Sequence, residues 1–153
     1  MDGEALADDE HQRFAHYQQV LARVSAGNEA SLVSAVLRDE DVTMAQSAVV
    51  SHLDRRADEL LTDPRFPDWA DAMAPVIAPR EFLTRRLREW TLLRSVSADD
   101  GWSAEDVLAA SDWLQRKIVR TATSPAALRL LASKGRTRRV RSTASRQLLR
   151  QHP

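Results

Sequence analysis

The spacing of apolar residues is the feature that most constrains the fold of this 153-residue chain. Every apolar segment repeats at steps of three and four residues, as in Phe14, Tyr17 and Leu21, and none alternates over the length of a strand. A three-to-four period places apolar side chains on one face of an α-helix, whereas a half-buried strand needs a period of two. The sequence therefore predicts an all-α fold of about seven helices, without a sheet.

The segment from Ser124 to Leu149 predicts two helices joined by a tight turn. Ser124 is a typical N-cap, and Pro125 suits the first helical position, where its missing N–H costs no hydrogen bond. Gly135 is expected to end this helix in the left-handed conformation, and Thr137 is expected to cap the next helix. The segment therefore predicts an antiparallel helical hairpin, which is better suited to a binding surface than to an active site.

The residue pattern of this hairpin resembles one unit of the HEAT and armadillo class of helical repeats. The resemblance lies in the leucines of its first helix, the short turn, and the series Val140, Arg141, Ala144 and Leu148. Residues 29–61 match partially, with Ala45 in the place that Arg141 takes in the C-terminal unit. In HEAT-type repeats a turn Asp and the following Arg form a ladder between neighbouring units. The resemblance therefore implies a short HEAT-like stack of helical hairpins.

The formal net charge of zero hides a division of charge along the chain. Residues 113–153 contain eleven basic residues and no Asp or Glu, so residues 1–112 hold the other eleven basic residues and all 22 acidic ones. Such asymmetry indicates a nucleic acid, the acidic surface of a partner, or a contact between the two ends of the molecule itself. The sequence leaves these three alternatives open.

The arginine run at the start of the last helix is the main candidate for anion or partner binding. Arg138, Arg139 and Arg141 fall in the first helical turn, where the helix dipole disfavours cations by up to about 1 kcal/mol each. Guanidinium groups beside exposed N–H groups bind phosphates and carboxylates, so cations placed there indicate a function. In the alternative interpretation, Arg141 is a repeat-ladder residue and the others pair with acids of the N-terminal half. The candidate binding residues are Arg136, Arg138, Arg139, Arg141, Arg146 and Trp113.

Trp113 belongs to this set because of its expected direction. In one continuous helix that begins after Ser103, Val107 and Leu114 lie in the inward stripe, and Trp113 lies about 150° from the centre of that stripe. Trp113 is therefore expected to face away from the core. It would then either pack under a neighbouring repeat or anchor a partner, a role in which tryptophan is common.

Three further predictions concern helix ends and faces. Thr43, with Gln46 three residues later, predicts a capping box at the start of the third helix. Pro75 and Pro79 are expected to break the helix that Pro67 opens. Phe82 is expected to point inward from the helix that follows.

The chain offers little material for catalysis. It has four glycines and no cysteines, and it contains no phosphate loop, dinucleotide fingerprint, nucleophile elbow or helical pair of histidine ligands. The acidic residues 39–41 fall in an expected turn, where carboxylates cap helices. We therefore expect a non-catalytic chain without cofactor or metal. A small helical enzyme acting on an acidic substrate is the third interpretation.

Length and composition indicate a single domain, residues 1–153, with residues 1–7 and 151–153 disordered. The acidic start lacks the basic segment and apolar core of an export signal, and no apolar run approaches the roughly 20 residues of a membrane span. The absence of cysteine fits a reducing compartment. We therefore expect a cytoplasmic location and no membrane partner.

Together these features predict a non-catalytic binding or adaptor module. Its expected partner is a protein with an acidic surface, recognised through helical-repeat surfaces and the basic C-terminal hairpin. The alternative function is binding of a nucleic-acid phosphate backbone through the same basic region.

Overall fold

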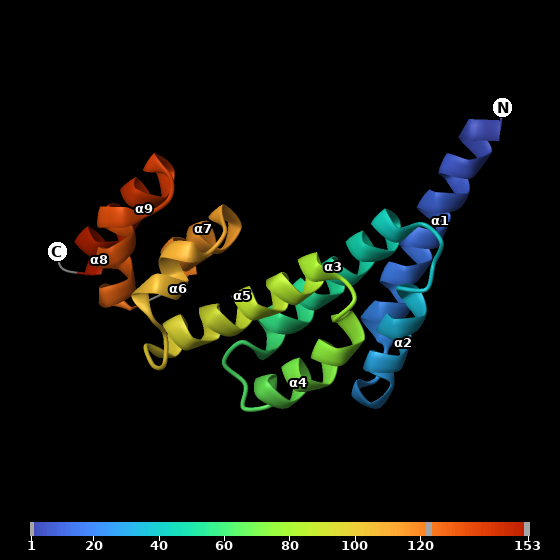
Figure 1. Cartoon of the computed structure of the whole chain (residues 1–153), viewed down its shortest axis with the longest axis horizontal. Helices are drawn as coiled ribbons and strands as arrows, with labels where there is room; N and C mark the ends of the chain where they lie inside the picture. Colours follow the sequence, from blue (N-terminus) through green and yellow to red (C-terminus); the bar gives the residue numbers. More distant parts are fainter. Residues whose placement is uncertain (1, 122–123, 152–153) are drawn as a thin grey trace. The chain divides into compact units, whose positions relative to one another are not determined.

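The computed structural model describes residues 2–121 and 124–151, and in these ranges the chain is helical without any strand (Figure 1). The all-α prediction is confirmed, whereas the predicted count of about seven helices is too low. The described ranges contain nine α-helices and one short 3-10 helix: α1 (Asp2–Arg23), η1 (Ala26–Asn28), α2 (Glu29–Val36), α3 (Val42–Leu60), α4 (Phe66–Ile77), α5 (Glu81–Ala98), α6 (Ala104–Ala109), α7 (Asp112–Thr121), α8 (Pro125–Lys134) and α9 (Arg138–Gln151). None of these helices is both long and apolar enough to cross a bilayer.

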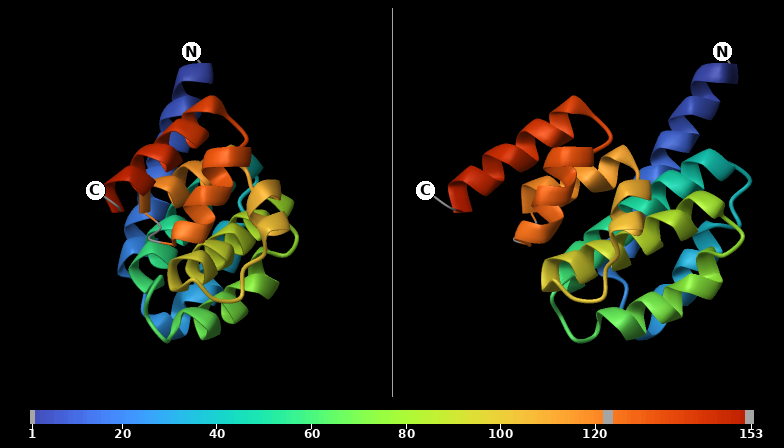
Figure 2. Two further views of the ribbon diagram at one scale, coloured as in Figure 1. Left: turned by 90° about the vertical axis from the view of Figure 1, so that its left-hand side faces the viewer. Right: turned by 60° about the vertical axis from the view of Figure 1, so that its left-hand side comes forward.

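The helices group into two compact units, residues 1–87 and residues 88–153, hereafter unit 1 and unit 2. Unit 1 holds α1 to α4 and the start of α5. Within it α3 packs against α1, and α2 packs against α4 (Figure 2). Its core contains fully buried aliphatic side chains such as Val33, Leu53 and Ile77.

The ends of α1 and of α9 differ from the sequence-based prediction. Helix α1 begins at Asp2, in the segment predicted to be disordered, rather than near Asp8. Helix α9 extends to Gln151, while Met1 and residues 152–153 lie outside the described residues.

The predicted cap of α3 is wrong, since Asp41 and not Thr43 caps this helix. The Asp41 carboxylate accepts a hydrogen bond from the Met44 backbone N–H at 3.0 Å. The Asp41 backbone N–H in turn donates to the Asp39 carboxylate at 2.9 Å. Two neighbouring acids therefore fix the turn before α3, and the helix begins one residue before Thr43.

Pro75 does not break α4, contrary to the prediction, because it lies inside a helix that continues to Ile77. Met73 and Ile77, on either side of the proline, are both buried in the core of unit 1. Burial of these two side chains holds the helical backbone across the hydrogen bond that proline cannot make.

Phe82 is also misassigned, since 48% of this residue is exposed. Leu83 and Leu87 take the inward positions of α5. The Arg86 guanidinium lies 5.7 Å from the centre of the Phe82 ring, one helical turn away. Phe82 therefore makes a cation–π contact on its own helix and does not enter the core.

In unit 2, the helix predicted after Ser103 is broken into α6 and α7 at residues 110–111. Ser111 caps α7, since its hydroxyl oxygen accepts the Leu114 backbone N–H at 3.2 Å. Glu89 of α5 accepts hydrogen bonds from the Ser111 backbone N–H at 2.8 Å and from its hydroxyl at 2.6 Å. The break therefore depends on a carboxylate 22 residues earlier, which a local pattern does not reveal.

Helices α8 and α9 pack against each other across residues 135–137 and form the predicted helical hairpin (Figure 2). Its predicted caps are confirmed. The Ser124 hydroxyl accepts the Ala127 N–H at 3.2 Å, and the Thr137 hydroxyl accepts the Val140 N–H at 3.1 Å. Ser124 also donates to the Asp99 carboxylate at 2.7 Å, which ties the start of α8 to the end of α5.

Gly135 ends α8 for a different reason from the predicted one. Its φ angle is −54°, so it does not adopt the left-handed conformation. A Cβ at this position would lie 2.5 Å from the Leu131 carbonyl oxygen and 2.7 Å from Val140 Cγ1. The hairpin therefore requires glycine because the two helices approach too closely for a side chain.

We predict that Gly135→Ala destabilises the protein by about 1 to 3 kcal/mol, because the added methyl group overlaps the backbone of α8 and the side chain of Val140. Gly27→Ala is the matched control, since a Cβ at Gly27 meets nothing within 4 Å. Urea unfolding of both variants measures the difference. Equal midpoints for the two variants would contradict the close-approach explanation.

The single-domain prediction can be tested by calorimetry. The boundary between the two units falls inside α5, a continuous helix of 18 residues. We expect one unfolding transition in which the calorimetric and van't Hoff enthalpies agree, because α5 cannot unfold in one unit without fraying in the other. Two resolved transitions would instead mean that the units fold as separate domains.

Candidate functional site

The predicted arginines lie on the α8–α9 turn and on α9 in unit 2. Arg138 and Arg139 are the first two residues of α9, and both side chains are exposed. Arg136 precedes them on the turn, and Arg146 follows two turns later; both are exposed. Arg141 is half-buried. The five arginines therefore lie on one turn and one helix, but they do not share one environment.

Arg141 and Arg136 are partly occupied by structural hydrogen bonds. Arg141 Nη1 donates to the Gly135 carbonyl at 2.8 Å, so this side chain closes the turn of its own hairpin. The backbone N–H of Arg136 donates to Gln115 Oε1 at 2.8 Å. Arg136 Nη2 also lies 3.5 Å from the Ala109 carbonyl oxygen. These contacts explain why the chain places both arginines beside the turn.

Gln115 is a buried residue that the sequence analysis missed. Its Nε2 group donates to the carbonyls of Val107 at 2.9 Å and Leu108 at 3.2 Å, while its Oε1 accepts the Arg136 N–H. One fully buried amide therefore joins α6, α7 and the α8–α9 turn. A glutamine among charged residues in a helix is usually exposed, so the local sequence gave no sign of this role.

Arg138 and Arg139 differ from Arg136 and Arg141 in their contacts. Among the described residues of unit 2, no side chain forms a hydrogen bond or ion pair with either guanidinium. The interpretation that they pair with acids of the N-terminal half stays a prediction. Both side chains are thus available at the positive end of the α9 dipole.

The solvent-exposed side of α9, which we call the arginine face, carries no acidic residue. Helical periodicity places one group of exposed residues along this side: Arg138, Arg139, Ser142, Ser145, Arg146, Leu149 and Arg150. Leu149 is 72% exposed. The face therefore combines four cations with an accessible apolar side chain. Unit 2 as a whole has 13 basic and six acidic residues, whereas unit 1 has nine basic and 16 acidic residues.

Trp113 lies on α7, outside the arginine face, and its direction differs from the prediction. The predicted angle of about 150° assumed one continuous helix after Ser103. The break between α6 and α7 rotates the side chains of α7 relative to that assumption. Trp113 is half-buried, and its ring meets the Trp90 ring edge-on at 5.7 Å between centroids. Lys117 Nζ lies 4.8 Å from the Trp90 centroid and 6.0 Å from that of Trp113. Trp113 therefore packs inside unit 2 rather than facing away.

Unit 1 contains a buried polar cluster that the sequence analysis did not identify, hereafter the Glu29 cluster. Glu29 is 3% exposed and His52 is 2% exposed. Glu29 Oε2 accepts hydrogen bonds from His52 Nε2 at 2.7 Å, Arg56 Nε at 3.0 Å and Trp69 Nε1 at 3.0 Å. One carboxylate from α2 thus binds donors from α3 and α4. The cluster consists of Glu29, His52, Arg55, Arg56 and Trp69.

The hydrogen bonds of the cluster determine the tautomer of His52. Arg55 Nη2 lies 2.9 Å from His52 Nδ1, and a guanidinium can only donate, so Nδ1 is the acceptor. The ring proton is then on Nε2 and points to Glu29. Arg55 Nη2 also donates to the Leu21 carbonyl at 3.3 Å, which connects α3 to the end of α1.

Burial and hydrogen bonding act in opposite directions on the Glu29 carboxyl group. Burial raises its pKa, but the hydrogen bonds from His52, Arg56 and Trp69 favour the charged form and bring the pKa down to about 2. Glu29 is therefore ionised in the folded protein at neutral pH. The carboxylate is the centre to which the other members of the cluster are attached.

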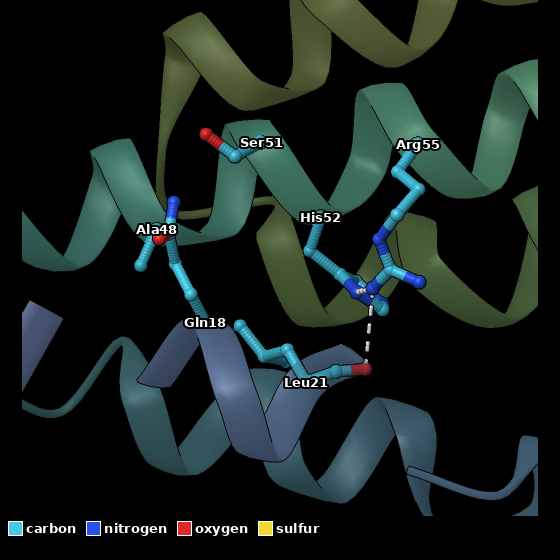
Figure 3. A pocket seen from close by; sticks show the side chains of 6 residues that line it. All are labelled: Gln18, Leu21, Ala48, Ser51, His52 and Arg55. Carbon is cyan, nitrogen blue, oxygen red and sulfur yellow. Dashed lines mark hydrogen bonds between the residues drawn. The ribbon is translucent and has the colours of Figure 1, made fainter. Parts of the chain in front are cut away.

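Two pockets in unit 1 are lined in part by residues of the Glu29 cluster. His52 and Arg55 line the first, of about 220 Å³, together with Gln18, Leu21, Ala48 and Ser51 (Figure 3). Glu29 and Arg56 line the second, of about 300 Å³, whose walls include the apolar side chains of Leu60, Trp69 and Met73. The cluster thus borders both pockets.

One sequence signal could have revealed the cluster. His52 falls on the buried stripe of α3, between Val49 and Leu53, where a polar residue needs a partner. Arg55 and Arg56 both contact Glu59 of their own helix. Their additional buried partners come from other helices and are absent from the local pattern.

No family model, curated protein or solved structure matches this chain. Two of its arrangements can support binding chemistry. The arginine face of unit 2 presents exposed cations to an anionic surface, and the Glu29 cluster of unit 1 places a buried imidazole at the wall of a pocket.

A second carboxylate of unit 1 is held in a similar way. The pKa of Asp39 is lowered to about 2, chiefly by the hydrogen bond from the Tyr17 hydroxyl at 2.6 Å. The Asp41 backbone N–H and Arg13 also donate to this carboxylate. Asp39 therefore ties the N-terminal helix α1 to the turn before α3.

We predict that unit 1 loses stability as the pH falls from about 4.5 toward 2. In this range the unfolded chain binds protons at Glu29 and Asp39 that the folded protein does not, so acid favours unfolding. Above the ordinary values of 4.5 and 3.8 the stabilisation is fully present. The indole N–H signal of Trp69, the one tryptophan of unit 1, reports the transition by NMR.

Glu29→Gln tests the origin of this acid sensitivity. The variant should be less stable at pH 7 by about 3 kcal/mol, because Arg56 loses its buried carboxylate. Its stability should also depend less on pH between 4.5 and 2. An unchanged pH dependence would show that other groups cause the acid effect.

Proposed function

We propose that this chain is a non-catalytic binding module that recognises a protein partner with an acidic surface through the arginine face of α9. One observation carries the proposal: Arg138 and Arg139 are exposed at the first turn of α9, and no side chain among the described residues of unit 2 pairs with either guanidinium. The other arginines of the run support it, because Arg141 and Arg136 hold the turn on which these two depend.

The energetic argument rests on the α9 dipole. Two cations at a helix N-terminus raise the free energy of the unbound protein, since the dipole repels them. A partner carboxylate removes this repulsion and adds charge-assisted hydrogen bonds to the guanidinium groups. The cost in the unbound state is therefore recovered in the complex.

Leu149 favours a protein over a nucleic acid as the partner. It is 72% exposed on the same side of α9 as the arginines. Protein interfaces combine arginine with apolar contacts, whereas contacts to a phosphate backbone come from donors and cations. An apolar side chain within the basic face is thus better matched by a protein surface.

We also propose that the pairs α2–α3 and α8–α9 act as HEAT-like repeat units. Each pair consists of consecutive helices that pack together across a short connection. Each also buries aliphatic side chains, such as Val33 and Val49 in the first pair and Leu131 and Val140 in the second. In this proposal the repeats support the surface, and the arginine face provides the specific contact.

The double variant Arg138→Gln/Arg139→Gln tests the function. We expect its stability to be unchanged or slightly raised, because repulsion from the helix dipole is removed. Its affinity for a fluorescent acidic peptide, a glutamate 20-mer, should fall at least about tenfold, since charge-assisted hydrogen bonds contribute about 1.5 kcal/mol or more each. Fluorescence anisotropy and thermal melts at low and high salt provide both measurements.

Arg85→Gln/Arg88→Gln is the matched control, since it removes the same charge from exposed positions of α5. This control should bind the peptide like the wild type. The proposal fails if the Arg138/Arg139 double variant is destabilised at low salt yet binds the peptide fully, because the arginines would then serve an internal contact.

A nucleic-acid arm distinguishes the alternative function. A random-sequence DNA duplex is titrated in the same assay at several salt concentrations. Phosphate tracking gives an affinity that falls log-linearly with salt, with a slope set by the number of phosphates contacted. The duplex could bind more tightly than the peptide, with a salt dependence that corresponds to several contacted phosphates. That result would favour a nucleic acid over a protein as the partner.

A further inference from the structure

The hydrogen bond between Arg55 and His52 can form only when Nδ1 of the histidine ring carries no proton. Arg55 Nη2 lies 2.9 Å from His52 Nδ1, and it can only donate. The contact therefore needs an unprotonated Nδ1. The other ring nitrogen is held by Glu29 at 2.7 Å, so the ring cannot turn its free nitrogen elsewhere without losing that bond.

Protonation of His52 would place two donors against each other. The new Nδ1–H would point at the Arg55 guanidinium, which has no acceptor atom. Arg55 would then have to move or to share an acceptor with the ring. The geometry leaves room for this, because 40% of the Arg55 side chain is exposed while 1% of the His52 side chain is exposed.

The charges around the ring make an anion the natural acceptor. Arg55 and Arg56 of α3 face the ring and its carboxylate partner, and they are balanced by Glu29 of α2 and Glu59 of α3. Helix α1 presents the Leu21 carbonyl, and α4 presents the uncharged Trp69 N–H. A proton on His52 leaves three cations against two carboxylates. One monoanion restores the balance.

The pocket in front of His52 offers a place for that anion. It measures about 220 Å³ and is lined by His52 and Arg55, which meet in Figure 3 close to the Leu21 carbonyl. Gln18 of α1 and Ser51 of α3 add a carboxamide and a hydroxyl to its wall. The Gln18 carboxamide supplies a further hydrogen-bond donor, whereas the Ser51 hydroxyl already donates to the Ser47 carbonyl at 3.0 Å.

We propose that this pocket binds a small oxyanion, a phosphate or a carboxylate, between His52 Nδ1 and the Arg55 guanidinium, together with a proton on His52. The anion accepts a hydrogen bond from each group and so relieves the contact between the two donors. Proton uptake and anion binding are therefore linked, and each strengthens the other. The site lies in unit 1 and is independent of the arginine face proposed to bind a protein.

Phosphate titration of the full chain by NMR at pH 5.5 and pH 7.5 tests this site. Sodium chloride keeps the ionic strength constant. We expect saturable shifts of the His52 ring and the Arg55 side chain at pH 5.5 and an at least tenfold weaker Kd at pH 7.5. Weaker binding at the higher pH is informative, because phosphate carries more negative charge there. Simple attraction to arginine would therefore make phosphate bind more tightly at pH 7.5.

Acetate, which carries one charge at both pH values, is titrated in a second arm. Saturable acetate binding with the same pH dependence identifies a general oxyanion site, whereas phosphate binding alone restricts the site to phosphate. Failure of both ions to bind at pH 5.5 overturns the proposal. So does binding of either ion that is equally strong or stronger at pH 7.5.

Two variants and a control connect the binding to the named residues. Arg55→Met should lose anion binding at pH 5.5, and the exposure of Arg55 allows this change without loss of the core. His52→Gln keeps a donor toward Glu29 but should lose the pH dependence. His16→Gln, at an exposed position of α1, should bind as the wild type does. Loss of the pH dependence in His16→Gln, or full binding by Arg55→Met, contradicts the assignment.

Discussion

Helices in both units meet at buried polar side chains, and these side chains must be hydrogen-bonded because an unpaired polar group in a core costs about 1 to 3 kcal/mol. In unit 1 the constraint acts on Glu29, whose carboxylate accepts from His52, Arg56 and Trp69. The donors come from two helices other than its own. Packing of apolar faces brings these helices together, but the carboxylate defines how they are aligned.

Unit 2 solves the same problem with an amide and a second carboxylate. Gln115 joins two helices to the α8–α9 turn, and Glu89 holds Ser111 where α6 ends and α7 begins. Both side chains bind residues between two helices rather than residues in the middle of a helix. The hairpin that carries the arginine face is therefore oriented by residues outside it.

The arginines of unit 2 divide into structural and available groups, although they are adjacent in sequence. Arg141 donates to a carbonyl of its own turn, while Arg138 and Arg139 pair with no side chain in the part of unit 2 that the structure describes. All three residues are arginines, and their positions around the helix axis decide which of them is half-buried. Arg141 lies next to the buried Val140 and reaches back over the turn, whereas Arg138 and Arg139 project into solvent. A charge count along the chain cannot separate these roles.

The sequence alone determined the helical class, the caps at Ser124 and Thr137, and the position of the α8–α9 hairpin. These features depend on residues within four positions of one another, so periodicity and capping rules reach them. The same rules placed the arginines at the start of α9.

Tertiary structure alone decided the break between α6 and α7, the packing of Trp113 on Trp90, and the Glu29 cluster. Each depends on a partner that is 20 or more residues away, as for Glu89 with Ser111 and Glu29 with His52. Gly135 shows the same limit, since its role is set by the closeness of two helices and not by its own φ angle. Local sequence patterns determine where helices form and end. Which distant side chains then contact each other depends on which helix faces are buried together.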